Sequence, residues 1–352
     1  MVVVRELDAE SDVALYELWQ QDLPQSTLYH SRAFHDFLRD ATGGRVIRLG
    51  AERDGKSVGL LAWGERNDPR WGTVINSLPW FGSHGGCLVA DDNDDQVRRA
   101  LLGALRARIA APDVLSATIA LTPAEEAHFD LYAQILEPRT VDRRIGQVTR
   151  LPTGRDPALI ASDLEVTISQ RTRWVCRKAN RQGFVEVVSN EIEQWQYLHR
   201  IHSANMDAIG GVAKPWDHFL ALRRHLAPKA TRLSVAYSDG QPVAAMLLAI
   251  HGTTVEYMIP AVDAAFRPLQ PLSFLIWQAM VDLIPKGAAE WNWGGTWTTQ
   301  GGLHLFKRGW GGEDRPYSYL VCASERSVNI LRQEGDWRTA FPYFYVFPYD
   351  QL

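Results

Sequence analysis

The stretch Trp291-Asn292-Trp293-Gly294-Gly295, followed by Phe306-Lys307-Arg308-Gly309-Trp310-Gly311-Gly312, is the most distinctive part of the chain. Aromatic side chains form rigid apolar walls, and glycines let the backbone approach a ligand closely. The pair Lys307-Arg308 adds positive charge near the end. This combination predicts a slot for a group that is anionic or becomes anionic. An aromatic core beneath a Gly-rich loop would give the same composition and remains an alternative.

Length and composition are those of a globular chain with room for two hydrophobic cores. Of its 352 residues, 46% are hydrophobic and 22% are charged, as is usual for soluble domains. The formal net charge of −4 argues against a protein that coats nucleic acid, so no DNA partner is expected. Thirteen Trp residues favour wide ligand clefts, because Trp offers both an apolar wall and a donor.

The N-terminus and the cysteines bear on the cellular compartment. The run Met1-Val2-Val3-Val4-Arg5-Glu6 is too short and too soon charged for a signal peptide. No stretch approaches the ~18 apolar residues of a membrane span. Cys87, Cys176 and Cys322 are odd in number and far apart, so neither a zinc site nor a disulfide framework is predicted. We therefore expect a cytoplasmic protein that binds no metal.

An internal repeat predicts two related domains. The octet 51–58, with Asp54-Gly55, matches the octet 236–243, with Asp239-Gly240, at four of eight positions. Asp-Gly is typical of tight hairpin turns, and both octets open the same series: strand, turn, strand, strand, loop, helix, strand. The pattern predicts a duplicated α/β unit. We place the domains at 1–151 and 152–352, divided at a Pro/Gly break.

Periodicity predicts individual elements in both halves. In the first half we expect helices at 11–21, 31–42, 95–109 and 123–135, and strands at 2–7, 46–53, 57–65, 72–78, 114–121 and 147–151. In the second half we expect helices at 167–181, 191–208, 216–226, 272–284 and 303–308, and strands at 184–189, 232–237, 242–251, 254–260, 290–293 and 317–323. Ser11 or Asp12 is expected to cap the first helix.

Three motifs resemble those of Fem-type transferases, in the order in which that family has them. Phe306-Lys307-Arg308-Gly309-Trp310-Gly311 resembles the family's F-K-(R/K)-x-(F/W)-G motif. Thr172-Arg173-Trp174 with Arg177-Lys178-Ala179-Asn180-Arg181-Gln182-Gly183 resembles a second, and Pro271-Leu272-Ser273-Phe274-Leu275-Ile276-Trp277 a third. The resemblance spans about half the chain. It implies two tandem GNAT-like domains, each a mixed, mostly antiparallel sheet flanked by helices, and an acyltransferase.

The basic helix is the first candidate site. Arg173, Arg177 and Arg181 recur every four residues and so share a helix face, with Arg171 and Lys178 beside them. Guanidinium groups suit phosphate oxygens. A solvated helix face is the alternative; few interleaved acids, and a buried side expected at Trp174 and Val175, count against it. The resemblance implies that Arg173, Arg177 and Lys178 bind an anionic part of the substrate.

Lys307 is the second candidate, and the resemblance implies that it stabilises charge on the scissile carbonyl. One well-placed donor in an apolar pocket lowers such a barrier by ~3–4 kcal/mol. We therefore expect Lys307→Ala to lower turnover about 100-fold with an unchanged melting temperature. An exposed helical Lys is the alternative. The walls of the slot are expected from Phe306, Trp291, Trp293 and Trp297, and Arg308 is expected beside it, facing solvent or a substrate phosphate.

The donor site is expected where two central strands separate, because GNAT donors lie there in the resembled fold. That point falls at Tyr257–Ala261 and the loop before the helix 272–284, near Arg267 and Gln270. The second half lacks the (Q/R)-x-x-G-x-(G/A) loop of ordinary acetyl-coenzyme A enzymes. We therefore slightly favour aminoacyl-tRNA as donor, with acyl-coenzyme A as the alternative and no tightly bound cofactor.

The general base is left open. Many relatives carry an acid where this chain has Asn292, and an amide cannot accept a proton at ordinary pH. Glu256, Asp263 and His304 are candidate bases, although a packed or solvated His304 is the commoner situation. The aromatic tail 341–349 is expected to be a last strand over the core or a contact surface.

These observations predict an N-acyltransferase that moves an aminoacyl or acyl group to an amine without a covalent enzyme intermediate. The expected acceptor is a cell-envelope or polysaccharide precursor, small or lipid-linked, or a small pathway metabolite. An acyl-coenzyme A-dependent N-acetyltransferase is one rival. A non-catalytic duplicated domain that binds peptide or sugar through its Trp-rich cleft is the other.

Overall fold

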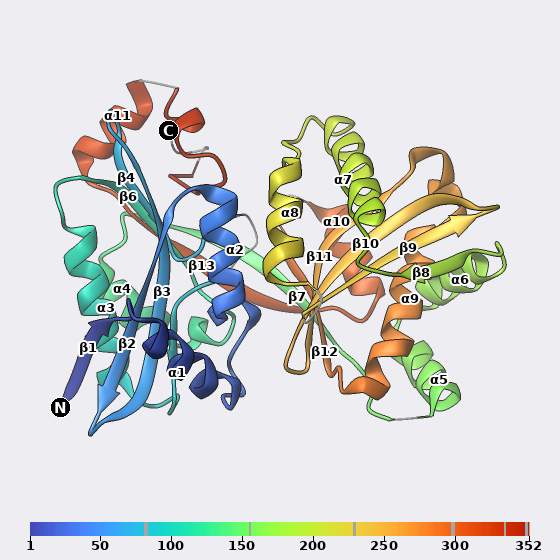
Figure 1. The fold of residues 1–352 in the computed structure, drawn as a ribbon, viewed down its shortest axis with the longest axis horizontal. Coiled ribbons are helices and arrows are strands. Elements are labelled where there is room, and N and C mark those ends of the chain that lie inside the picture. Colours follow the sequence, from blue (N-terminus) through green and yellow to red (C-terminus); the bar gives the residue numbers. More distant parts are fainter. Residues whose placement is uncertain are drawn as a thin grey trace. The chain divides into compact units, whose positions relative to one another are not determined.

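The computed structural model describes residues 1–80, 84–154, 156–227, 230–296, 300–333, 336–348 and 351. The chain forms two compact units (Figure 1). Unit 1 contains Met1–Arg144 and Pro316–Leu352, and unit 2 contains Ile145–Arg315. These units differ from the predicted division at 1–151 and 152–352, because the C-terminal segment returns to pack with the first half of the chain.

Unit 1 is built on a mixed sheet with the strand order β1-β2-β3-β4-β6-β13, and β5 pairs with β3. The parallel pair is β4 and β6, and the other neighbours are antiparallel. Its strands are β1 (Val2–Glu6), β2 (Arg45–Arg53), β3 (Lys56–Asp68), β4 (Gly72–Asn76), β5 (Cys87–Val89), β6 (Val114–Ala120) and β13 (Glu313–Cys322). Its helices are α1 (Glu10–Gln21), α2 (Arg32–Thr42), α3 (Asp95–Ile109), α4 (Phe129–Leu136), α11 (Glu325–Gln333) and α12 (Trp337–Ala340).

Unit 2 repeats this arrangement with the strand order β8-β9-β10-β11-β12-β7. Here β11 and β12 are the parallel pair, and the other neighbours are antiparallel. Its strands are β7 (Thr140–Arg150), β8 (Val185–Val188), β9 (Thr231–Ser238), β10 (Gln241–His251), β11 (Thr254–Val262) and β12 (Glu290–Thr296). Its helices are α5 (Pro157–Thr167), α6 (Gln170–Asn180), α7 (Ile192–Asp207), α8 (Trp216–His225), α9 (Pro271–Leu283) and α10 (Gly301–Gly309).

The predicted duplication is therefore present at the level of strand pairing. Both Asp-Gly pairs form hairpin turns, between β2 and β3 and between β9 and β10. Asp54 and Gly55 have φ of 52° and 74°, and Asp239 and Gly240 have 49° and 77°. Two successive positive φ angles match the right-handed twist of the flanking strands. Strand β7 begins in unit 1 and pairs with β12, whereas β13 begins in unit 2 and pairs with β6.

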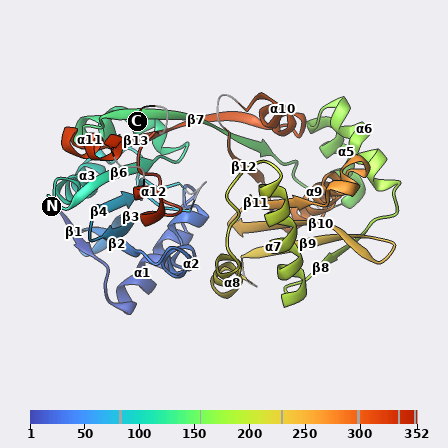
Figure 2. The same cartoon turned by 90° about the horizontal axis from the view of Figure 1, so that it is seen from above.

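Helices cover both faces of each sheet (Figure 2). In unit 1, α1 and α2 lie on one face and α3 on the other, where α4 shares a core cluster with α3; in unit 2, α7 and α8 lie on one face and α5, α6, α9 and α10 on the other. The alternation along β3 explains this, since Leu60 packs with α1 residues and Leu61 with α3 residues. Ser31 caps α2 by accepting from Phe34 N, and Gly43 ends it with φ of 63°.

Several local predictions were wrong. Ala9, not Ser11 or Asp12, precedes α1, and no side chain caps that helix. The helix expected at 167–181 is α6, which begins only at Gln170 because Ser169 caps it by accepting from Thr172 N at 3.2 Å, and α5 before it was not predicted. The described part of the C-terminal tail is not a strand. It does cover a core, since Phe341, Phe344 and Phe347 are buried.

Candidate functional site

The two parallel strands of unit 2 separate part of the way along. Strands β11 and β12 pair between Thr254–Glu256 and Glu290–Asn292. Beyond these residues, no further pairing between the two strands is found in the described part of the chain. The rings of Tyr257, Trp291 and Trp293 pack together at this point, with centroids 5.1 to 6.0 Å apart. The predicted place of strand separation, at Tyr257 and beyond, is therefore the place the structure has.

Strand β12 carries a bulge just beyond the separation. Its register with β7 shifts between Asn292 and Gly295, and Gly294 has φ of 70°, which a residue without Cβ adopts at little cost. The Asn292 side chain stabilises the bulge from within, because its Oδ1 accepts from Gly294 N at 2.9 Å and its Nδ2 donates to Glu256 Oε2 at 2.9 Å. Asn292 and buried Glu256 thus hold the two strands together where they part.

Lys307 reaches this bulge from α10. Its Nζ donates to Gly294 O and Gly295 O, both at 3.0 Å, and to Thr296 Oγ1 at 2.7 Å. The residue is only 3% exposed, and burial lowers the pKa of Lys307 to about 8. An ammonium has three protons, so every donor of Lys307 has an acceptor within unit 2. It would meet a substrate oxygen only by giving up one of these bonds.

A polar network continues from Lys307 through buried Gln147. Thr296 Oγ1 donates to Gln147 Oε1 at 3.5 Å, and Gln147 Nε2 donates to Asp314 Oδ1 at 3.2 Å. Asp314 also binds His304 Nε2, at 2.9 and 3.0 Å. A carboxylate that fixes one ring nitrogen orients an imidazole, so His304 is held in place rather than merely solvated.

A cavity of about 410 Å³ lies on the other side of α10, between α6 and the start of α9. Phe306 and Trp310 line it, but Lys307 does not, because residue 307 projects from a different face of the helix. The residues that line the cavity are Ser169, Arg171, Thr172, Val175, Gln270, Ser273, Gly302, Leu305, Phe306, Gly309 and Trp310.

The cavity meets the amino end of α9, where backbone N–H groups are available. The first intrahelical bond is made by Phe274 N to Gln270 O at 3.2 Å, so the N–H groups of Leu272 and Ser273 precede the helical ladder. Gln270 has φ of 67°, a conformation that costs a side-chain-bearing residue energy and that recurs at ligand sites. Such a helix end favours an anion.

The basic residues of α6 are placed differently from the prediction. Arg173 donates to Glu165 O at 2.7 Å, and Arg177 forms an ion pair with the Glu165 carboxylate at 2.7 Å, which raises the pKa of Arg177. Lys178 Nζ donates to Pro268 O at 2.9 Å. Arg171, which we expected only to flank the stripe, is the cation of α6 that lines the cavity.

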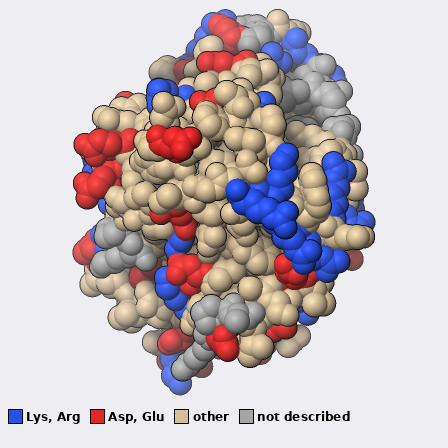
Figure 3. Space-filling view, turned by 90° about the vertical axis from the view of Figure 1, so that its right-hand side faces the viewer, with Lys and Arg blue, Asp and Glu red and all other residues tan. Residues whose placement is uncertain are grey.

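The predicted buried side of this helix was also wrong. Trp174 is 63% exposed, and the buried residues of α6 are Cys176 and Ala179. Figure 3 looks onto the side of unit 2 where α6 lies and shows Lys and Arg gathered there with few acids between them.

The other predicted site residues divide into two groups. Trp291 and Trp293 are fully buried in the core of unit 2 and do not line the cavity, whereas Gln270 and Phe306 do. Asp263 caps a short 3-10 helix (Ala264–Leu269) by accepting from Ala265 N at 2.9 Å, and Arg308 is exposed. Trp297 lies outside the described residues.

The residues that sequence reasoning missed are Gln147, Glu165, Thr296 and Asp314. Glu165 could not be found because α5 was not predicted, and Gln147 lies far from its partners in sequence. Arg171 was predicted only as a neighbour of the arginine stripe. Its spacing could have placed it on the same helix face as Trp174 and Lys178, because it lies three residues before Trp174 and Lys178 lies four residues after it.

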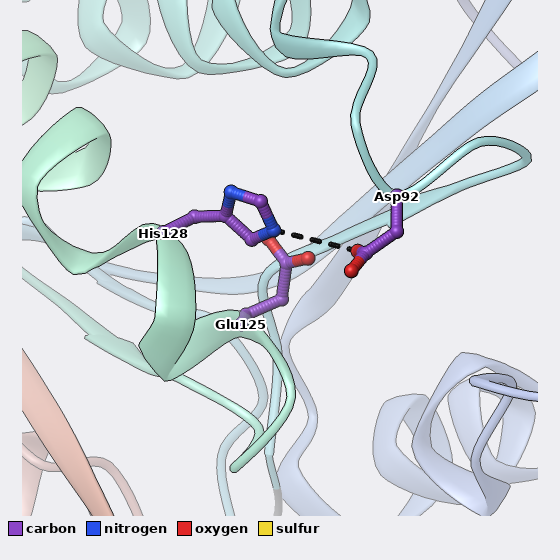
Figure 4. Close-up of side chains that lie close together, drawn as sticks. All are labelled: Asp92, Glu125 and His128. Atoms are coloured by element: carbon purple, nitrogen blue, oxygen red, sulfur yellow. Dashed lines mark ion pairs between the residues drawn. The ribbon is translucent and has the colours of Figure 1, made fainter.

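A group in unit 1 has the spacing of a metal site (Figure 4). One ligand atom each of Asp92, Glu125 and His128 lies within 4.8 Å of the others. Buried Arg98, however, donates to Glu125 Oε1 at 2.9 Å and to Asp92 Oδ1 at 2.5 Å. Its guanidinium already supplies the positive charge that two carboxylates need, so we interpret the group as an ion-pair network.

In each unit a helix connects the two parallel strands of a mixed sheet, α3 between β4 and β6 and α9 between β11 and β12. Residues 169–308 match the family model described as acetyltransferase (GNAT) domain. No curated protein sequence matches the chain significantly. The predicted enzyme class, an acyltransferase, is confirmed.

Solved structures extend the fold to the whole chain. FemX is similar with a TM-score of 0.72 and 13% identity, over 94% of this chain and 100% of its own. A tandem GNAT protein from the clavulanic acid biosynthesis pathway has a TM-score of 0.58 and 13% identity, over 92% of this chain and 98% of its own. L-PGS from Bacillus licheniformis gives 0.53 and 15%, over 93% and 96%.

The resemblance to Fem-type tandem GNAT proteins is thus confirmed at the level of the fold. Among the described residues, no helix combines the length and apolar character needed to cross a membrane.

Proposed function

We propose that unit 2 transfers an acyl or aminoacyl group from an activated carrier to an amine. The cavity at the amino end of α9, whose wall residues Phe306 and Trp310 pack against Trp293 of β12, carries this proposal. Its N–H groups and Arg171 suit donor phosphates, and its walls of Phe306, Leu305 and Trp310 suit the apolar part of a donor.

In the reaction, the amine nitrogen attacks the carbonyl carbon of the donor ester or thioester. The bond from that carbon to the carrier oxygen or sulfur breaks, and the carrier leaves with a proton. The amine loses a proton to a base. His304 is the candidate base, because its hydrogen bond to Asp314 orients the imidazole ring. Stabilisation of the carbonyl oxygen by Lys307 remains a prediction, since it requires one of three bonds to be exchanged.

Two donor classes fit the proposal. The GNAT domain model that residues 169–308 match supports acyl-coenzyme A, and the resemblance of the three motifs to Fem-type transferases supports aminoacyl-tRNA. The acceptor is proposed to be an amine on a cell-envelope or polysaccharide precursor, lipid-linked or free, or on a small metabolite.

Intact-mass analysis of pooled amine acceptors tests the proposal. The chain is incubated with an acyl-coenzyme A pool or with charged tRNA, and acceptors are examined for the added mass of an acyl or aminoacyl group. A product from either pool supports the proposal and names the donor. Absence of any product from both pools, with binding of donor also absent, would refute it.

A further inference from the structure

We propose that α6 carries a nucleobase platform, formed by Trp174 between Arg171 and Lys178, that binds the adenosine end of the acyl donor. The proposal rests on the proposed function, because it assigns a further part of the same donor to a further part of the site. Adenosine with nearby phosphates is common to coenzyme A and to the 3′ end of tRNA, so the platform is defined by that shared chemistry.

The three side chains share one face of α6. Their spacing of three and then four residues puts them in a row along the helix. Arg171 lines the cavity, and Lys178 bonds Pro268 O, two residues before Gln270 of the cavity wall. The row therefore borders the cavity along the side where α9 begins.

Trp174 has no structural reason to be exposed at this position. It leaves 63% of its surface in solvent, although an indole is among the side chains that gain most from burial. Lys178 Nζ lies 5.8 Å from the ring centroid, a cation–π distance that orients the indole. An oriented and open aromatic ring, flanked by cations, is the arrangement on which bases stack while phosphates are neutralised.

The charges near Trp174 favour an anionic nucleotide. Glu165, the acid that pairs with α6 in the described residues, engages Arg173 and Arg177 on another face of the helix. Arg171 in the row and Arg267, next to the Pro268 that Lys178 bonds, are both exposed. Positive charge thus lies on both sides of the indole at the cavity rim, and within the described part of the chain no carboxylate pairs with Arg171 or Lys178.

Binding of adenosine 3′,5′-bisphosphate, the nucleotide end of coenzyme A, tests the platform. Stacking contributes ~1–3 kcal/mol per base, so we expect Trp174→Ala to weaken binding about 5- to 100-fold. Trp174→Phe keeps a ring and should stay within about threefold of the original affinity. Leu159→Ala, which trims an exposed apolar side chain of α5, is the matched control and should have no effect.

The donor source is distinguished by a second arm. If coenzyme A is the donor, Trp174→Ala raises the KM for acetyl-coenzyme A but not for acetyl-pantetheine, which lacks the nucleotide. If tRNA is the donor, the same variant binds an RNA oligonucleotide ending in CCA more weakly, and its affinity for coenzyme A is unchanged.

Unchanged affinity of Trp174→Ala for both the bisphosphate and the CCA oligonucleotide would overturn the platform. So would loss of binding to anionic phosphatidylglycerol vesicles as the sole effect of the variant. Active enzyme with either result leaves the proposed function standing. Normal nucleotide binding without acyl transfer from any donor would instead sustain the platform and defeat the proposed function.

Discussion

At the residue scale, Lys307 connects the sequence motif to the structure. The motif singled it out as a cation in a buried slot, and it is 3% exposed and donates to the backbone directly after Trp293. Its three acceptors in the β12 bulge could not be predicted, because the bulge depends on pairing with β7, which comes from the other half of the chain. A lysine bound in this way holds the bulge in shape whether or not it also meets substrate.

The structure therefore changes the expected effect of removing this ammonium. Lys307→Met leaves two carbonyls and one hydroxyl without their donor, and each such loss costs ~1–3 kcal/mol. We expect chemical denaturation to show at least about 2 kcal/mol less stability at pH 7. Lys286→Met, an exposed lysine paired with Asp282, is the control and should change stability by about 0.5 kcal/mol or less. An unchanged melting temperature for Lys307→Met would contradict this account.

The buried ammonium also predicts a pH dependence. Burial lowers the pKa of Lys307 from 10.5 to about 8 in the folded chain, so between these values the unfolded chain binds more protons. Stability from this group therefore rises as pH increases from 8 to 10.5, by up to about 3 kcal/mol. Denaturation of the original chain and Lys307→Met at pH 7 and pH 10 measures the difference. A stability difference that stays constant with pH would exclude the effect.

At the element scale, the hairpins and most helices could be predicted and the contacts between elements could not. The two hairpin turns could be predicted from the octets alone, because Asp-Gly pairs readily adopt the positive φ angles that such a turn requires. Helix α5 was not predicted, so the role of its residue Glu165 was not predicted either. Glu165 binds Arg173 and Arg177, and neither arginine lines the cavity. The exposure of Trp174 could not be read from α6 alone, because it depends on which face packs on α9.

The β12 bulge gives a prediction at this scale. Gly294 has φ of 70° but nothing within 4 Å of an added Cβ, so Gly294→Ala is penalised by backbone strain alone, about 1 kcal/mol. Gly103→Ala in α3 also meets nothing within 4 Å, and should stabilise the chain by about 0.5–1 kcal/mol. Thermal unfolding of both variants measures the contrast. If both substitutions changed the stability in the same direction, Gly294 would not be the strained residue of the bulge.

At the scale of the whole molecule, the duplication predicts two equivalent strand pairs that have diverged. In unit 1, pairing of β4 and β6 runs as far as Asn76 and Thr118, and Ser77 Oγ then accepts from Ala120 N at 2.9 Å. The Asn76 amide donates to Tyr345 O at 2.8 Å and accepts from Tyr345 N at 2.7 Å. The chain's own C-terminal segment thus occupies, in unit 1, the end of the pair that corresponds to the separation of β11 and β12 in unit 2.

One donor per chain follows from this difference. Calorimetric titration of the full chain with the donor identified by the product screen should give a stoichiometry near one. Among the described residues, the cavity at the end of the unit 1 strand pair has a volume of about 30 Å³, which is too small for a second donor. Two equivalent sites per chain would contradict the assignment of donor binding to unit 2.

The cavity of unit 2 is the central claim, and Gly302 offers the most direct measurement of it. Gly302 lines the cavity, and a Cβ added there meets nothing within 4 Å; the same open space surrounds Gly301, which does not line the cavity. Donor affinity should fall at least about 10-fold in Gly302→Trp and stay unchanged in Gly301→Trp. If both variants bind donor as tightly as the original chain, the donor does not lie in this cavity.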